Sequence, residues 1–233
     1  FDEPISIKNY IAKKNIDLEK SSADEYINFV KGFGYKLINA INENSVATPH
    51  GIIASSVLNC PKNSFTKKQL FSRVRLYMSL LQDMKADLSD TLLINPDTTL
   101  KKVTMDFIAR NFIEFADDDD KEIQENTIFI VKGNKRAILD YYKNSLISFV
   151  YHYSYTALAI LEIDRFQISS YDLSHRFKFL ENMFKDEFFF NEDITSDANI
   201  EKSIRGFVQE GILVPDTRGD DLYRIPSKGL RKL

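Results

Sequence analysis

Three histidines are the side chains of this chain that could act as a general base or bind a metal: His50, His152 and His175. Such a role needs a carboxylate or a second ligand at a spacing that brings the two groups together. None of the three has a histidine, cysteine or acidic residue at a suitable spacing on a helix face. We therefore predict no catalytic residue, no metal site and no cofactor. His50 is expected in a capping or surface role at a helix start, His152 as a hydrogen-bonded core residue and His175 on a helix.

The other reactive groups also favour structural roles. The single cysteine, Cys60, excludes an internal disulfide and a thiolate metal cluster, and it suits a reducing cytoplasm. We interpret it as a small buried apolar side chain. The acidic run 117–120 lacks the alternating acids, the glycine and the closing glutamate of a calcium loop, so a solvated turn is expected.

Composition restricts the class of protein. The chain has 233 residues, 43% of them hydrophobic and 28% charged, with a net charge of −3. These values are ordinary for a globular protein and argue against a dedicated nucleic-acid-binding domain. The uncharged stretch from Asn144 to Leu161 is slightly shorter than the ~20 residues of a membrane span and contains several polar residues. We predict a buried helix there, with Phe149, Leu158 and Leu161 in the core.

The front end, residues 1–47, is predicted to be a linker strand followed by an amphipathic helix. Ser22 and Glu25 have the spacing of a capping box. Apolar residues then recur at helical spacing. They are Tyr26, Val30, Phe33, Leu37 and Ile41.

Beyond residue 47 the sequence repeats itself. The segments "SFTKKQLFSRV" (64–74) and "QISSYDLSHRF" (167–177) share an apolar residue, a Ser or Thr and a later Leu and Arg. Thr66 and Ser169 stand at the expected N-cap of a helix in each copy. Downstream, Asn111 and Gly211 occupy matching positions where a left-handed residue ends a helix.

Each copy then has a turn and a short β-type segment, so three helices and a two-stranded hairpin are expected twice. We predict a mainly α fold, with the helical front end followed by two winged-helix-like repeats with short β-hairpins. Their predicted bounds are 48–138 and 139–233. The first repeat contains the acidic run 117–120, which would repel a nucleic-acid backbone.

A nucleic-acid function is therefore not favoured for these repeats. The candidate recognition helices carry a few cations, partly offset by acids. They are Lys101, Lys102 and Arg110 in the first copy, and Lys202 and Arg205 with Glu201 and Glu210 in the second. We expect no nucleic acid as a partner, and we keep a tandem winged-helix module that binds DNA or protein as the alternative function.

Several segments resemble one known family in the same order. "FDEPISIKNYI" resembles the F-G-E-P-I element that closes the acyltransferase domain of glycerol-3-phosphate acyltransferases of the large bacterial and mitochondrial type, with Asp2 in place of the glycine. "INENSVATPHGIIASSVL", "SFTKKQLFSRVRLYMSLL" and "FLENMFKDEFFF" are similar to later segments of that family. "LDYYKNSLISFV" matches its Y-[YF]-[RK]-N-x-[LI] element through Tyr141, Tyr142, Lys143, Asn144 and Leu146. We expect these five residues to be structural, with Tyr142 and Asn144 making hydrogen bonds.

The resemblance implies a non-catalytic C-terminal region. In this family the catalytic base lies in a His-x4-Asp motif, whereas Ser55, Ala157 and Leu180 follow the three histidines here at that spacing. The chain also begins with Phe1 rather than Met, as a fragment would. The parent enzyme would transfer an acyl group from acyl-CoA or acyl carrier protein to glycerol 3-phosphate in phospholipid biosynthesis, although the related dihydroxyacetone-phosphate acyltransferases leave the acceptor open.

The same resemblance implies the partners and the location. The expected partners are the catalytic acyltransferase domain of the same polypeptide and, through the parent enzyme, a membrane surface. The parent is expected at the cytoplasmic face of a membrane, and the isolated chain is expected to be soluble and cytoplasmic.

Overall fold

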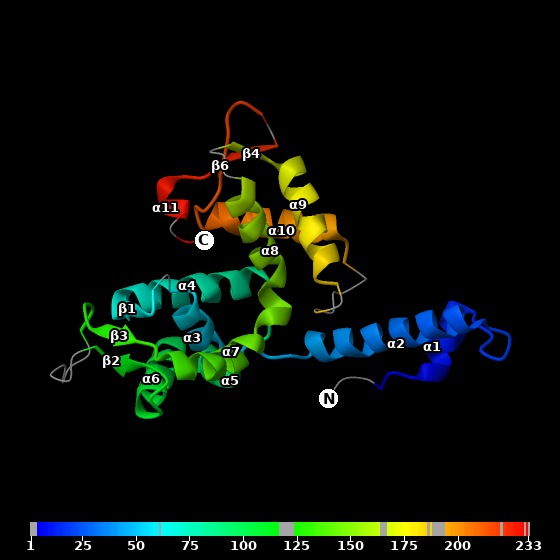
Figure 1. Ribbon diagram of the computed structural model, residues 1–233, viewed down its shortest axis with the longest axis horizontal. Coiled ribbons are helices and arrows are strands. Elements are labelled where there is room, and N and C mark those ends of the chain that lie inside the picture. Colours follow the sequence, from blue (N-terminus) through cyan, green and yellow to red (C-terminus); the bar gives the residue numbers. More distant parts are fainter. Residues whose placement is uncertain are drawn as a thin grey trace.

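A helical arm and two similar units make up the protein, as a computed structural model shows (Figure 1). The structure describes residues 4–60, 62–116, 124–163, 167–185, 187, 194–219, 221–230 and 232. The arm is drawn in blue and points away from both units, and the second unit stands above the first in this view. The predicted mainly α class is confirmed.

The arm is a hairpin of α1 (Ile7–Lys14) and α2 (Ala23–Glu43). Ser22 and Glu25 form the predicted capping box: each side chain binds the backbone N–H of the other residue, at 3.3 and 2.7 Å. The predicted linker strand is not found in the described part of the front end. Residues 4–6 are irregular and the next eight residues form α1, because Ser6 caps that helix by accepting from the Asn9 N–H.

The first unit contains three long helices and a small sheet, with one short helix added. Its elements are α3 (Pro49–Leu58), β1 (Ser64–Thr66), α4 (Lys67–Asp83), α5 (Asp90–Ile94), α6 (Pro96–Ala109), β2 (Glu114–Phe115) and β3 (Ile128–Ile130). The strands pair antiparallel in the order β1-β3-β2. The acidic run 117–120 lies outside the described residues.

The second unit repeats this order after a short connection. The connection is η1 (Gly133–Lys135) and α7 (Arg136–Asn144). The unit consists of α8 (Ile147–Ile163), β4 (Gln167–Ser169), α9 (Ser170–Met183), α10 (Ser196–Gln209), β5 (Val214–Pro215), β6 (Leu222–Arg224) and α11 (Ser227–Leu230). Its strands pair antiparallel in the order β4-β6-β5, which corresponds strand by strand to the first sheet.

The helix ends of the two units match as the sequence repeat predicts. Thr66 and Ser169 cap α4 and α9, each accepting from the N–H three residues later. Asn111 and Gly211 have φ values of 55° and 65°, in the left-handed region that Asn and Gly tolerate. The N–H after each donates to the carbonyl of a buried phenylalanine, Phe107 or Phe207, at 2.8 Å in both units.

Two apolar cores lie on either side of a shared helix. The first core includes Phe107 and Phe129, and the second includes Phe177 and Phe207. Helix α4 belongs to the first unit, yet its residues Leu76 and Leu80 are buried in the second core. The two units are therefore joined through apolar packing as well as through the chain.

The connecting helix α7 packs against α3 of the first unit. Leu139 and Leu146 are fully buried in the first core. The predicted boundary between residues 138 and 139 remains a prediction, but α7 as a whole contributes to the first core.

No single described helix is both long enough and apolar enough to cross a membrane. The bent pair formed by residues 133–144 and 147–163, at 106° to one another, meets the length and composition criteria only as a pair.

Candidate functional site

The Tyr-Tyr-Lys-Asn element occupies the C-terminal half of α7. Tyr141 is 77% exposed, whereas Leu146, just beyond the helix, is fully buried. Lys143 Nζ lies 2.8 Å from Asp140 Oδ1, one turn back on the same helix, where both side chains are half-exposed. An ion pair of this kind stabilises a helix by only about 0.3–0.5 kcal/mol.

The side chain of Tyr142 contacts the first unit through its aromatic ring. The ring lies 5.6 Å from the His50 ring in a stacked arrangement, and 5.7 and 6.2 Å from the rings of Phe107 and Phe112. The predicted hydrogen bonding involves the Tyr142 main chain, because its carbonyl accepts from Ser145 Oγ at 2.7 Å. Within the described residues, the side chain of Asn144 has no hydrogen-bond partner; it lines a hollow near the end of α2.

Gly51 allows α3 to approach this element closely. A Cβ atom at Gly51 would lie 2.6 Å from Ser145 Oγ and 3.1 Å from Leu146 Cγ, which is closer than side chains tolerate. The backbone of α3 therefore rests directly on the end of α7. Of the five residues, Tyr142 and Leu146 therefore pack against the first unit, whereas Tyr141 and Asn144 are exposed.

The histidines are separated by the fold. His50 Nε2 lies 3.6 Å from an Asp106 carboxylate oxygen, beyond a hydrogen bond, and Arg110 Nε already donates to that carboxylate at 2.9 Å. His175 is exposed on α9. His50 and His175 therefore lie in different units, on α3 and α9.

His152 is buried in α8 as predicted, but it is not hydrogen-bonded as predicted. Its Nε2 atom has no partner among the described residues. Burial lowers the pKa of His152 to about 3, with the positive charge of Lys202 acting in the same direction. The imidazole is therefore neutral at physiological pH, and it packs against Tyr153 with ring centroids 4.5 Å apart.

Possible metal ligands and the single thiol are further reactive groups among the described residues. No three His, Cys, Asp or Glu residues there lie close enough together to hold a metal ion. Burial raises the pKa of Cys60 to about 11, so the thiol stays protonated at neutral pH. Its sulfur lies 3.3 Å from the Ser56 carbonyl oxygen, one turn back along the chain.

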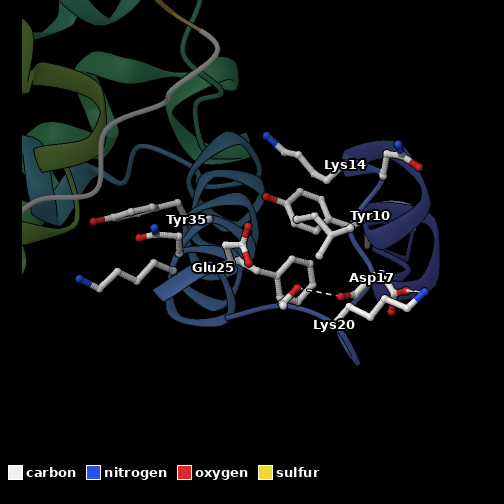
Figure 2. A pocket seen from close by; sticks show the side chains of 13 residues that line it. Tyr10, Lys14, Asp17, Lys20, Glu25 and Tyr35 are labelled. Carbon is white, nitrogen blue, oxygen red and sulfur yellow. Dashed lines mark hydrogen bonds and ion pairs between the residues drawn. The ribbon is translucent and has the colours of Figure 1, made fainter. Parts of the chain in front are cut away.

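A hollow of about 760 Å³ lies between α1 and α2 (Figure 2). Tyr10 points from α1 toward α2, where its ring lies 5.6 and 5.1 Å from the rings of Phe29 and Phe33. The rim carries charges of both signs, and Lys20 Nζ lies 3.1 Å from Asp17 Oδ2. Mixed charges of this kind do not define a site for an anion or a cation.

The apolar stripe of α2 faces solvent. Ile41 is 66% exposed, and four further apolar side chains along the helix are each more than a third exposed. They are Tyr26, Ile27, Val30 and Leu37. Helix α1 packs against one flank of α2 through Tyr10 and leaves this stripe open. A contiguous exposed apolar surface of this kind is typical of an interface.

The prediction of a core position for Phe149 is confirmed, but for Leu158 and Leu161 it is wrong. These two leucines on α8 are 48% and 49% exposed. They line a groove between α8 and α4, to which Phe207 of α10 also contributes. Hydrophobicity alone could not reveal which face of this mostly apolar helix would be left open.

The family comparison agrees with the resemblance seen in the sequence. A family described as "Glycerol-3-phosphate acyltransferase C-terminal region" matches residues 1–231. Among curated proteins, no match to the chain is found. The family match covers almost the whole chain, and the recognition made from its motifs is confirmed. The chain therefore belongs to the family of C-terminal regions of glycerol-3-phosphate acyltransferases.

Proposed function

We propose that this chain is the non-catalytic C-terminal domain of a glycerol-3-phosphate 1-O-acyltransferase. The family match over residues 1–231 supports this role. So does the absence of a His-x4-Asp motif from the sequence. The parent enzyme would transfer an acyl group from acyl-CoA or acyl carrier protein to the sn-1 hydroxyl of glycerol 3-phosphate. It would work at the cytoplasmic face of a membrane.

The role of the domain is to pack against the catalytic domain of the same polypeptide, with α2 as the contact surface. The observation that carries this proposal is the open stripe of α2, from Ile27 to Ile41. Burying apolar area stabilises a contact by about 25 cal/mol per Å². Tyr10 of α1 packs instead against the flank of this helix, at Phe29 and Phe33.

We infer that the two units are winged-helix-like and serve as protein-interaction modules, an inference supported by their matching strand orders β1-β3-β2 and β4-β6-β5. Their third helices, α6 and α10, carry few cations. Arg110 is paired with Asp106 at 2.9 Å on α6. On α10, Lys202 and Arg205 share their helix with Glu201. A surface with this balance of charge does not attract a phosphate backbone strongly.

Two matched variants test the contact surface. Ile41→Asp places a charge in the open stripe of α2, and Leu93→Asp places one at an equally exposed leucine of α5. The chain is mixed with the separately purified catalytic region of its parent, and binding is measured by analytical ultracentrifugation. We expect Ile41→Asp to abolish binding and Leu93→Asp to preserve it. Equal binding by both variants would show that α2 is not the contact.

An activity assay tests the non-catalytic role. The purified chain is incubated with acyl-CoA and either glycerol 3-phosphate or dihydroxyacetone phosphate, and no acyl transfer is expected. Turnover that disappears on replacing one of its histidines would contradict the proposal. Fluorescence anisotropy with duplex DNA at two salt concentrations tests the alternative, since sub-micromolar, salt-sensitive binding would favour a nucleic-acid module.

A further inference from the structure

A cleft between the two units combines an apolar groove with a cationic mouth. The groove has a volume of about 300 Å³ and the mouth about 1010 Å³. The two spaces are adjacent, because Asn59, Leu76 and Lys232 line both of them. Sites of about 300–1,000 Å³ are the size that small molecules occupy in proteins.

The groove is lined mainly by α4 and α8, with Phe207 of α10 and Ile212 completing its apolar lining. Helices α4 and α8 meet where Tyr153 donates a hydrogen bond to Asp83 at 2.7 Å. One and two turns back along α4, Leu80 and Leu76 form one wall of the groove. The opposite wall belongs to α8 and includes Ala157, Leu158 and Leu161. The half-exposed leucines at the rim are apolar area that an occupant would cover.

The mouth has an excess of positive charge. Among its described lining residues, Arg73, Arg75 and Lys232 are cations and Glu210 is the only acid. Arg73 Nη1 donates to the carbonyl oxygen of Lys232, which holds the C-terminal segment across α4. Lys232 Nζ lies 3.4 Å from the Glu210 carboxylate. The sum of these charges is +2, so the mouth favours an anion.

We propose that this cleft binds a single-chain anionic amphiphile, with its alkyl chain in the groove and its carboxylate or phosphate at the mouth. A free fatty acid and a monoacyl glycerol phosphate share this chemistry. The arrangement of the cleft supports the proposal, since the apolar groove adjoins the cationic mouth at Leu76 and Lys232. The proposal does not depend on the docking of α2, which lies on the arm.

The shape of the cleft also argues against other ligands. A free inorganic anion would leave the leucines of the groove exposed, and a neutral apolar molecule would not use the cations of the mouth. A single alkyl chain with an anionic head covers both regions at once. The affinity of the cleft is therefore expected to depend both on the length of the alkyl chain and on the negative charge of the head group.

Calorimetry with the whole chain tests the proposal. The probes are octanoate, decanoate and dodecanoate below their micelle concentrations, with decanol as the neutral control. A buried methylene is worth about a fourfold change in Kd, so each step of two should tighten binding roughly 15-fold until the groove is full. The same titration with 1-decanoyl glycerol 3-phosphate distinguishes the two head groups, and the tighter ligand identifies the source. A chain-length-independent Kd, or equal binding of decanol, would overturn the proposal.

Paired variants locate the site. Leu161→Asn in the groove should weaken decanoate binding about tenfold, whereas Leu93→Asn on α5 should have no effect. Arg75→Gln should weaken it about two- to fivefold, and Arg136→Gln on α7 should not. Circular dichroism confirms that each variant is folded. Normal decanoate binding by Leu161→Asn and Arg75→Gln would show that the binding site is elsewhere. If decanoate does not bind at all, and Leu161→Asn abolishes binding to the catalytic region of the parent enzyme, the groove is a protein interface.

Discussion

Gly206→Ala is expected to destabilise the protein, although alanine is normally the better helix former. Gly206 lies in α10 directly beneath the Tyr153 ring. A Cβ atom there would be 2.6 Å from the Tyr153 hydroxyl oxygen and 2.8 Å from Cε1. Tyr153 would have to move away, and its hydroxyl donates to Asp83 Oδ2 at 2.7 Å across the junction of the two units.

The expected loss follows from three contributions to the free energy of unfolding. Replacing a helical glycine by alanine adds about 1 kcal/mol of stability. Overpacking removes about 1–3 kcal/mol. The hydrogen bond to a carboxylate contributes about 1.5–3 kcal/mol, of which we count the lower part because Asp83 is half-exposed. The net loss is about 1.5–3.5 kcal/mol, which lowers Tm by roughly 3–14 °C in a chain of this size.

Gly34→Ala is the matched control. Gly34 also lies inside a helix, α2, but a Cβ atom there meets no atom within 4 Å. The same substitution should raise the free energy of unfolding by about 0.5–1 kcal/mol. Urea and thermal unfolding of both variants, followed by circular dichroism, measure the two effects with opposite sign.

A Tm for Gly206→Ala that equals or exceeds that of the unsubstituted chain would refute this reasoning. It would mean that packing between the two units does not hold the Tyr153 ring in place. Tyr153→Phe separates the contributions. This substitution removes the hydrogen bond to Asp83 and the atom nearest to the new methyl group. Gly206→Ala should therefore lower the free energy of unfolding by less in the Tyr153→Phe variant than in the unsubstituted chain.

Three further predictions concern a helix cap, the first core and a buried histidine. Thr66→Ala removes the N-cap of α4, which accepts from the Gln69 N–H at 3.1 Å, and should lower stability by about 1 kcal/mol in urea unfolding. Leu139→Ala empties a fully buried site against α3 and should cost about 2–5 kcal/mol in the same assay. The folded-state pKa of His152, about 3, lies below its ordinary value of 6.5, so the unfolded chain binds more protons between these values. Stability should therefore fall as the pH drops from about 6.5 to about 3, by at most about 1.4 kcal/mol per pH unit, and a pH series of unfolding should show a weaker dependence for His152→Leu.

Local signals in the sequence predicted the elements and their ends. A cap residue acts on a backbone N–H three residues away, so Ser22, Thr66 and Ser169 could be assigned without knowledge of the fold. The left-handed positions Asn111 and Gly211 were equally visible, because few residue types tolerate that backbone conformation. The repeat of these signals led to the two-unit architecture.

Packing between distant segments could not be predicted in the same way. Leu158 and Leu161 carry the same apolar signal as buried residues, and only the position of α4 decides that they face a groove. The stripe of α2 likewise has the periodicity of a buried face, and sequence periodicity does not identify the molecule that covers it. Tyr142 was expected to make hydrogen bonds, and the contacts of its ring could not be foreseen because the partners of that ring come from α3 and α6.

The two leucines that α4 contributes to the second core have a consequence for folding. If the C-terminal unit were produced alone, from α8 onward, its core would lack Leu76 and Leu80, which lie beside Phe207. Such a half should behave as an aggregation-prone intermediate. The first core in turn contains Phe149 of α8, so each core needs one helix that the other unit also uses, and the two units should unfold together.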